Sequence, residues 1–111
     1  MKIRVTEARK VTVVVPKGDL DTAAASQLKR TFNDLIQTGK TRFVVDLRGV
    51  AYIDSASLGQ LVSAMKRARE AGGDLRLCGL RGNVLQIFEM TRLNKAMAVY
   101  PARKDALASW K

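Results

Sequence analysis

The fold of this chain is decided in residues 43–59, FVVDLRGVAYIDSASLG. The first three residues are apolar and two of them are β-branched, which favours a buried strand that ends at Asp46. From Leu58 onward apolar residues recur at helical spacing, so we predict a helix over residues 55–71. The small polar residues that open this helix can accept hydrogen bonds from its free N–H groups. The stretch therefore predicts a strand, a polar turn and a helix in succession.

The start of this helix is also a place where negative charge is stabilised. The first N–H groups of a helix lack partners within the helix, and its dipole is positive at that end. Judged by spacing alone, the segment from Asp54 to Ser57 is a helix cap first. A site for an anion or for a phosphorylated hydroxyl is the less common alternative.

Strands and helices alternate on both sides of this stretch. Towards the N-terminus, alternation over residues 3–8 and a β-branched run over 11–15 predict a hairpin, followed by a helix over 23–37 that Asp21 or Thr22 caps. Towards the C-terminus we predict a strand over 74–78, a helix capped by Asn83, a strand over 96–100 and, after Pro101, a helix over 102–110. This order indicates one α/β domain over residues 1–111, with a mixed sheet of four to five strands covered by about four helices.

The residue types present narrow the possible chemistry. The chain contains no histidine, which excludes a Ser-His or Cys-His catalytic pair, and its one cysteine, Cys78, cannot supply a thiolate cluster for zinc. Cys78 lies in an apolar run over residues 75–80, where a small buried hydrophobe is expected. The lone cysteine, with neither a signal peptide nor an apolar run long enough to span a bilayer, predicts a cytoplasmic protein without membrane insertion.

Four aspartates could be imagined as a magnesium site, namely Asp19, Asp21, Asp46 and Asp54. Their positions favour simpler roles, because Asp46 ends a strand and the others lie in turns or at helix starts. We therefore predict neither a metal ion nor a cofactor, and no catalytic residue.

The chain is strongly basic, with 20 Lys and Arg against 10 Asp and Glu and a formal net charge of +10. Such a charge keeps a surface solvated, and it also suits an acidic partner. Aromatic residues make up only 5% of the chain and no nucleic-acid-binding motif is present. An acidic protein is therefore the favoured partner, and direct nucleic-acid binding is not predicted.

Three stretches together resemble a known family. They are GDLDTAAASQLK at 18–29, VVDLRGVAYIDSASLGQLVSAMKRAREAGGDLRLCGL at 44–80 and VLQIFEMTRLNKAMAVYPARKDAL at 84–107. They are similar to STAS domains, which occur in sulfate transporters and anti-sigma factor antagonists. The likeness covers nearly the whole chain and is greatest to the stand-alone anti-anti-sigma factors of bacteria, which lack the transporter's membrane segment.

The resemblance implies a partner-switching cycle. In that family the serine at the start of the helix after the third strand, here Ser55, is phosphorylated by an anti-sigma factor that is a serine kinase. The unmodified protein would bind this kinase and free a sigma factor, phosphorylation would release the kinase, and a metal-dependent serine phosphatase would reset the cycle. The resemblance assigns the partner-binding surface to Asp21, Asp54, Ser55, Ala56, Ser57, Leu58 and Gly59.

One position departs from the family pattern, because Ser57 stands where the family commonly has glycine. Its hydroxyl is a second choice for phosphorylation, or a second helix cap. Simpler roles also remain open for its neighbours, since Leu58 and Leu61 fit the core and Gly59 could allow close helix packing. Two other functions stay open, an accessory subunit of a lipid-transport ATPase complex and a stress-signalling scaffold, both without phosphorylation.

Overall fold

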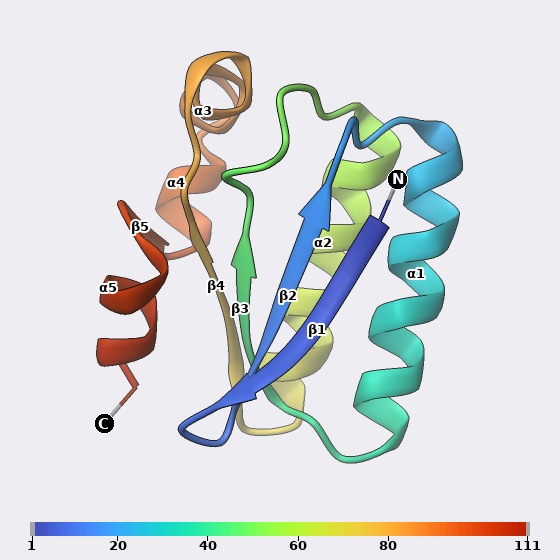
Figure 1. The fold of residues 1–111 in the computed structure, drawn as a ribbon, viewed down its shortest axis with the longest axis vertical. Helices are drawn as coiled ribbons and strands as arrows, with labels where there is room; N and C mark the ends of the chain where they lie inside the picture. Colours follow the sequence, from blue (N-terminus) through green and yellow to red (C-terminus); the bar gives the residue numbers. More distant parts are fainter. Residues whose placement is uncertain (1, 111) are drawn as a thin grey trace.

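The computed structural model describes residues 2–110 and shows a five-stranded sheet flanked by helices (Figure 1). The strands are β1 (Lys2–Ala8), β2 (Val11–Lys17), β3 (Arg42–Asp46), β4 (Asp74–Cys78) and β5 (Val99–Tyr100). The helices are α1 (Thr22–Gln37), α2 (Ser55–Glu70), α3 (Gly82–Met90), α4 (Leu93–Ala96) and α5 (Arg103–Ala108). The predicted α/β class is confirmed. Within residues 2–110 no helix has the length and apolarity needed to cross a membrane.

The strands lie in the sheet in their order along the chain, from β1 to β5. β1 and β2 form the predicted antiparallel hairpin, and every other neighbouring pair is parallel. Parallel neighbours need a crossover connection, and α1, α2 and α3–α4 supply the three crossovers. The sheet is therefore mixed, and the carboxyl ends of its parallel strands lie along one edge.

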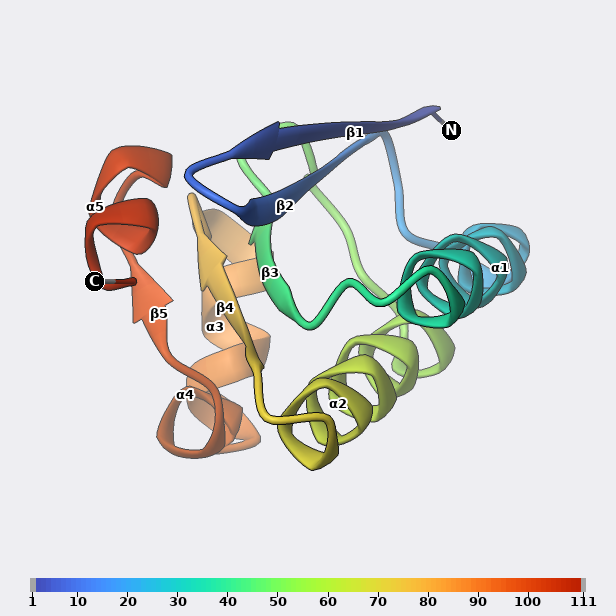
Figure 2. The ribbon, with the colours of Figure 1, turned by 90° about the horizontal axis from the view of Figure 1, so that it is seen from below.

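The helices divide unequally between the two faces of the sheet, as Figure 2 shows. One face carries α1 to α4 and the main core, in which Phe32 of α1 meets Phe43 of β3 edge to face with ring centroids 5.6 Å apart. The other face carries α5, whose buried Ala106 packs on a smaller cluster from β2, β3 and β4. Cys78 belongs to this smaller cluster and is fully buried, as predicted.

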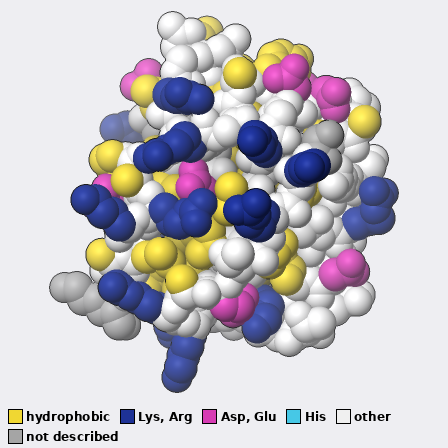
Figure 3. All heavy atoms as spheres, in the orientation of Figure 1, with side chains coloured by type: hydrophobic (Ala, Val, Ile, Leu, Met, Phe, Trp, Pro, Cys, Tyr) yellow, Lys and Arg dark blue, Asp and Glu magenta, His cyan; other side chains and the backbone are white. Residues whose placement is uncertain are grey.

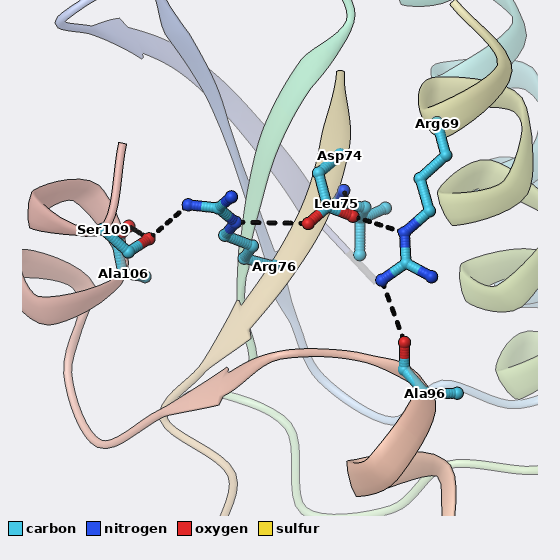
Figure 4. A network of polar contacts seen from close by, with 7 residues as sticks. All are labelled: Arg69, Asp74, Leu75, Arg76, Ala96, Ala106 and Ser109. Atoms are coloured by element: carbon cyan, nitrogen blue, oxygen red, sulfur yellow. Dashed lines mark hydrogen bonds and ion pairs between the residues drawn. The ribbon is translucent and has the colours of Figure 1, made fainter. Parts of the chain in front are cut away.

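A polar network centred on Asp74 joins four elements, as Figure 4 shows. The Asp74 carboxylate accepts hydrogen bonds from Arg69 Nε of α2 at 2.8 Å and from Arg76 Nε of β4 at 3.2 Å. Arg69 also donates to the Ala96 carbonyl at the end of α4, and Arg76 donates to Ser109 Oγ just after α5. The network therefore holds α4 and α5 against the start of β4.

A close backbone contact explains where the chain turns from α2 into β4. A Cβ atom at Gly73 would lie 1.7 Å from the Thr41 carbonyl oxygen, a separation no side chain can tolerate. The preceding residue, Gly72, has a φ of 89°, in the left-handed region that favours glycine. The predicted glycine stop of this helix is therefore confirmed, and its second glycine lets the next strand pass close to the loop before β3.

The C-terminal third differs from prediction in three ways. The strand predicted over residues 96–100 is only Val99–Tyr100, because the residues before it form α4 and the Met97 N–H donates to the Leu93 carbonyl. Asn83 is not a cap, since α3 already begins at Gly82.

The last helix is also shorter than predicted, spanning Arg103–Ala108 instead of residues 102–110. Its start is set by the Asp105 carboxylate, which accepts a hydrogen bond from the Ala102 N–H and so makes Ala102 the residue before the helix. Pro101 consequently lies outside the first turn.

Candidate functional site

The starts of α1 and α2 lie side by side at one edge of the sheet (Figure 1). The loops that lead into them are joined by a parallel bridge between Leu20 and Ile53. The Leu20 N–H donates to the Tyr52 carbonyl at 2.8 Å, and the Asp54 N–H donates to the Leu20 carbonyl at 2.9 Å. Two segments more than thirty residues apart in sequence are therefore fastened by backbone hydrogen bonds just before their helices begin.

The Asp54 carboxylate caps α2. Its Oδ1 accepts a hydrogen bond from the Ser57 N–H at 2.8 Å, and its Oδ2 accepts one from Thr22 Oγ1 at 3.0 Å. The backbone hydrogen bond from Ser57 is the main reason that the pKa of Asp54 lies below its usual value. The carboxylate is therefore ionised at neutral pH and places a fixed negative charge beside Ser55.

Asp21 caps α1 in the same way, because its Oδ1 accepts a hydrogen bond from the Ala24 N–H at 3.0 Å. Its backbone carbonyl accepts a second hydrogen bond, from Ser57 Oγ at 3.0 Å. Together with the bond from Thr22 to Asp54, this contact links the first turns of the two helices in both directions. These contacts bring Asp21 to the start of α2.

The two serines of this turn have different environments. Ser55 is the first residue of α2 and is exposed. Ser57 is fully buried at 0% exposure, with its hydroxyl engaged by the Asp21 carbonyl. A kinase or phosphatase could reach the Ser55 hydroxyl without disturbing the fold, whereas access to Ser57 would require the contact between α1 and α2 to open.

The remaining residues of the predicted surface divide by exposure. Ala56 and Gly59 are exposed, and a Cβ atom at Gly59 would meet no atom within 4 Å. Close helix packing is therefore the wrong explanation for Gly59. Leu58 is half-buried and packs against the core, and Leu61 is fully buried within it, as its spacing predicted.

Three of the four aspartates considered as metal ligands are engaged in other contacts, and Asp19 is exposed. Asp21 and Asp54 cap helices, and Asp46, at the end of β3, accepts hydrogen bonds from the Arg48 N–H and from Arg103 of α5. Among residues 2–110 no cluster of three or more His, Cys, Asp or Glu residues could hold a metal ion. Asp21 and Asp54 therefore serve to hold the starts of α1 and α2.

Comparison with known proteins agrees with this geometry. A model of the STAS domain matches residues 2–106. The chain belongs to the STAS domain family. BtrV of Bordetella bronchiseptica is 29% identical over 111 residues, which cover 100% of this chain and 96% of BtrV. The anti-sigma F factor antagonist of Paenibacillus polymyxa is 25% identical over 96% of this chain and 92% of its own length.

The same fold is found in solved STAS structures. An anti-sigma factor antagonist from Mycobacterium paratuberculosis superposes with a TM-score of 0.87 and 24% identity, covering 97% of this chain and 92% of that one. At this identity the likeness describes the fold alone. It places the five strands and the flanking helices in a known STAS arrangement.

One surface residue of this STAS domain was missed by sequence reasoning. Tyr52 lies in the apolar run before Asp54 and is 45% exposed. Its carbonyl accepts a hydrogen bond from the Leu20 N–H, which places its backbone in the paired segments that lead into α1 and α2. An aromatic residue next to the acidic turn adds apolar contact area to the surface.

Proposed function

We propose that this STAS protein is an anti-sigma factor antagonist that works by partner switching at Ser55. In its unmodified form it binds an anti-sigma factor serine kinase through the starts of α1 and α2, and phosphorylation of Ser55 releases the kinase. The observation that carries the proposal is an exposed serine on the first turn of a helix that Asp54 and Asp21 hold in place. Relatives named as anti-sigma factor antagonists support the antagonist role.

The position of Ser55 favours a switch of binding over a switch of folding. A phosphoserine carries about −1.5 to −2 charges at neutral pH, and a helix N-terminus stabilises negative charge. The domain can therefore accept the phosphate without rearrangement. In the complex with the kinase the same phosphate would lie beside the ionised Asp54. A partner surface that is complementary to the neutral serine would then face added volume and unpaired negative charge, which weakens binding.

Reversal of the switch requires the phosphate to be removed. We propose that a metal-dependent serine phosphatase restores the unmodified Ser55, whose exposure at the helix start leaves the phosphoester accessible. The metal would belong to the phosphatase. The role proposed for this chain is regulatory binding, in keeping with a sequence that offers no histidine for general base catalysis.

The decisive experiment compares two serine variants. The purified chain is incubated with ATP and the anti-sigma factor kinase of its own organism, and phosphate incorporation is followed by intact-mass and peptide mass spectrometry. Ser55→Ala should abolish incorporation. Ser57→Ala should still be phosphorylated, although loss of its hydrogen bond to Asp21 should lower the free energy of unfolding by about 1 kcal/mol.

Binding supplies the second measurement. Ser55→Asp should weaken the complex with the kinase while its unfolding transition stays cooperative. Phosphate on Ser57 in the wild-type chain would keep the mechanism and move the site. The switch would be contradicted if the kinase adds no phosphate to the purified chain and the protein isolated from its own cells carries none under any stress. That result would favour an accessory subunit of a lipid-transport ATPase complex or a scaffold.

A further inference from the structure

The open end of the β1–β2 hairpin, where β1 starts and β2 ends, is not covered by α5 and is basic. On the face of the sheet that α5 packs against, Val11 and Val13 are buried, but Val15 is only half-buried. Towards the open end of the hairpin, the positions next to Val15 on this face are cationic. Arg4 is directly opposite Val15, and Lys2 is directly opposite Lys17. Figure 3, in the orientation of Figure 1, shows Lys and Arg side chains spread over the face turned to the viewer, with carboxylates between and around them.

These three cations have no counter-charge among residues 2–110. The ion pairs of that part of the chain join Lys40 to Glu7, Arg69 and Arg76 to Asp74, and Arg103 to Asp46. Lys2, Arg4 and Lys17 are exposed and take part in none of them. Two lysines directly opposite each other on one face of a hairpin repel, so this arrangement disfavours the fold slightly. An external anion would remove that repulsion.

The same cations line a hollow of about 700 Å³ at the start of β1. Its lining residues are Lys2, Ile3, Arg4, Val15, Lys17 and Gln27. The half-buried Val15 provides apolar surface between the charged side chains, and Ile3, whose side chain packs towards the other face of the hairpin, lines the rim. Cations two residues apart on a strand are separated by about 7 Å, which is also the repeat of same-face side chains along an extended peptide.

The hollow adjoins the loop that leads to the proposed switch site. Lys17 ends β2, and the next residue, Gly18, donates its N–H to the Gly49 carbonyl at 3.1 Å. Two residues later Leu20 forms the bridge to Ile53, immediately before the start of α2. A partner that contacts Ser55 and Asp21 can therefore extend over residues 17–20 into the hollow without crossing any other element.

We propose that this hollow receives a carboxylate-rich segment of the anti-sigma factor, a contact that rests on the function proposed above. Acidic side chains would pair with Lys2, Arg4 and Lys17, and aliphatic parts of the segment would pack on Val15. A protein segment fits better than a membrane surface, because the cations line a hollow and Lys17 directly precedes the loop that leads to the proposed switch site. The contact would mainly accelerate association, since complementary charge steers the encounter of two proteins.

The first test needs no anti-sigma factor. A synthetic decaglutamate peptide is titrated into the full chain and followed by NMR chemical-shift changes. We expect the shifts to concentrate at Lys2–Arg4 and Val15–Lys17, and affinity to fall about tenfold in the triple variant Lys2→Gln/Arg4→Gln/Lys17→Gln. The matched control is Lys29→Gln/Arg30→Gln/Lys66→Gln, which removes the same charge from exposed positions of α1 and α2 and should bind almost as well as wild type.

Equal weakening in both triple variants would overturn the proposal, because it would reduce the effect to net charge. The proposal would also be overturned if the peptide produces no localised shifts while the chain binds phosphatidylglycerol vesicles or a single-stranded oligonucleotide, and the first triple variant abolishes that binding. The second test measures association rates with the anti-sigma factor. If that protein binds wild type and the first triple variant equally fast, only this inference fails; if it does not bind wild type at all, the proposed function fails.

Discussion

The face of the sheet under α1 to α4 and the face under α5 are built in different ways. The first buries whole aromatic side chains, with Phe32, Phe43 and Phe88 all at 0% exposure. The second buries small residues such as Val13, Cys78 and Ala106, and no aromatic residue is fully buried there. Its aromatic residues, Tyr100 and Trp110, are only half-buried. The Trp110 ring lies beside the guanidinium groups of Arg76, 3.7 Å from the ring centroid, and of Arg42, 5.5 Å away.

This difference separates stability from binding. Hydrophobic burial scales with the apolar area removed from water, so the face under the four helices supplies most of the stability. The α5 face depends on cation–π and polar contacts, which individually contribute little, and it leaves cationic strand positions open at the far end of the hairpin. The proposed switch site lies at the sheet edge, where α1 and α2 begin.

The largest expected effect is in the main core. Phe32→Ala should lower the free energy of unfolding by about 3–5 kcal/mol, because it removes a fully buried ring that packs edge to face on Phe43. Denaturant unfolding followed by circular dichroism measures the change. Arg30→Ala, on the exposed side of the same helix, is the control and should change it by less than about 0.5 kcal/mol. A loss below about 1 kcal/mol for Phe32→Ala would show that the two faces do not differ as described.

A smaller effect is expected on the α5 face. Trp110→Ala should lower the free energy of unfolding by about 1–2 kcal/mol, because the ring is only half-buried and part of its interaction is with Arg76 and Arg42. Amide hydrogen exchange should show α5 opening locally while α1 stays protected. If exchange rises equally in α5 and α1, α5 opens only together with the main core, and the two faces do not differ in this respect.

The Asp74 network makes stability depend on pH. Burial alone would raise the pKa of Asp74, but hydrogen bonds from Arg69, the Leu75 N–H and Arg76 outweigh it, so the pKa lies below 3.8. The stabilisation is therefore fully present above pH 3.8 and is lost as the pH falls below it through the lowered pKa. Asp74→Asn should lower the free energy of unfolding by about 1–2 kcal/mol at pH 7 and by less at pH 3. An equal loss of unfolding free energy at pH 7 and pH 3 would show that Asp74 does not contribute to the pH dependence of stability.

Cys78 provides the smallest signal and the most direct probe of the α5 face. Burial, aided by the nearby negative charge of Asp46, raises the pKa of its thiol to about 12. Because the thiolate is the reactive form, iodoacetamide should not label the native chain at pH 8 and should label it rapidly in denaturant. If iodoacetamide labels the native chain rapidly, and Trp110→Ala does not increase the rate, α5 does not shield Cys78 on this face.

Local sequence patterns predicted most elements, and tertiary contacts account for the differences. The helices over Thr22–Gln37 and Ser55–Glu70 were predicted nearly to their ends because their apolar spacing and capping aspartates agree. The C-terminal third was less regular. Val99–Tyr100 pairs with β4 over only two residues, and the start of α5 depends on the Asp105 side chain, which no periodicity indicates.

At the candidate site, the sequence determined the residue types: an Asp-Ser pair at the start of a helix, a second capping aspartate in an earlier turn, and a surplus of cations without histidine. These follow from short-range spacing, which is all that caps and periodicity require. Only the tertiary structure decided which serine is accessible. Ser57 is buried because its hydroxyl meets the carbonyl of Asp21, 36 positions away, and Ser55 is exposed because it lies on the outer side of the same turn. Likewise, Lys2 and Lys17 become neighbours only through the register of a hairpin, a contact that local sequence does not encode.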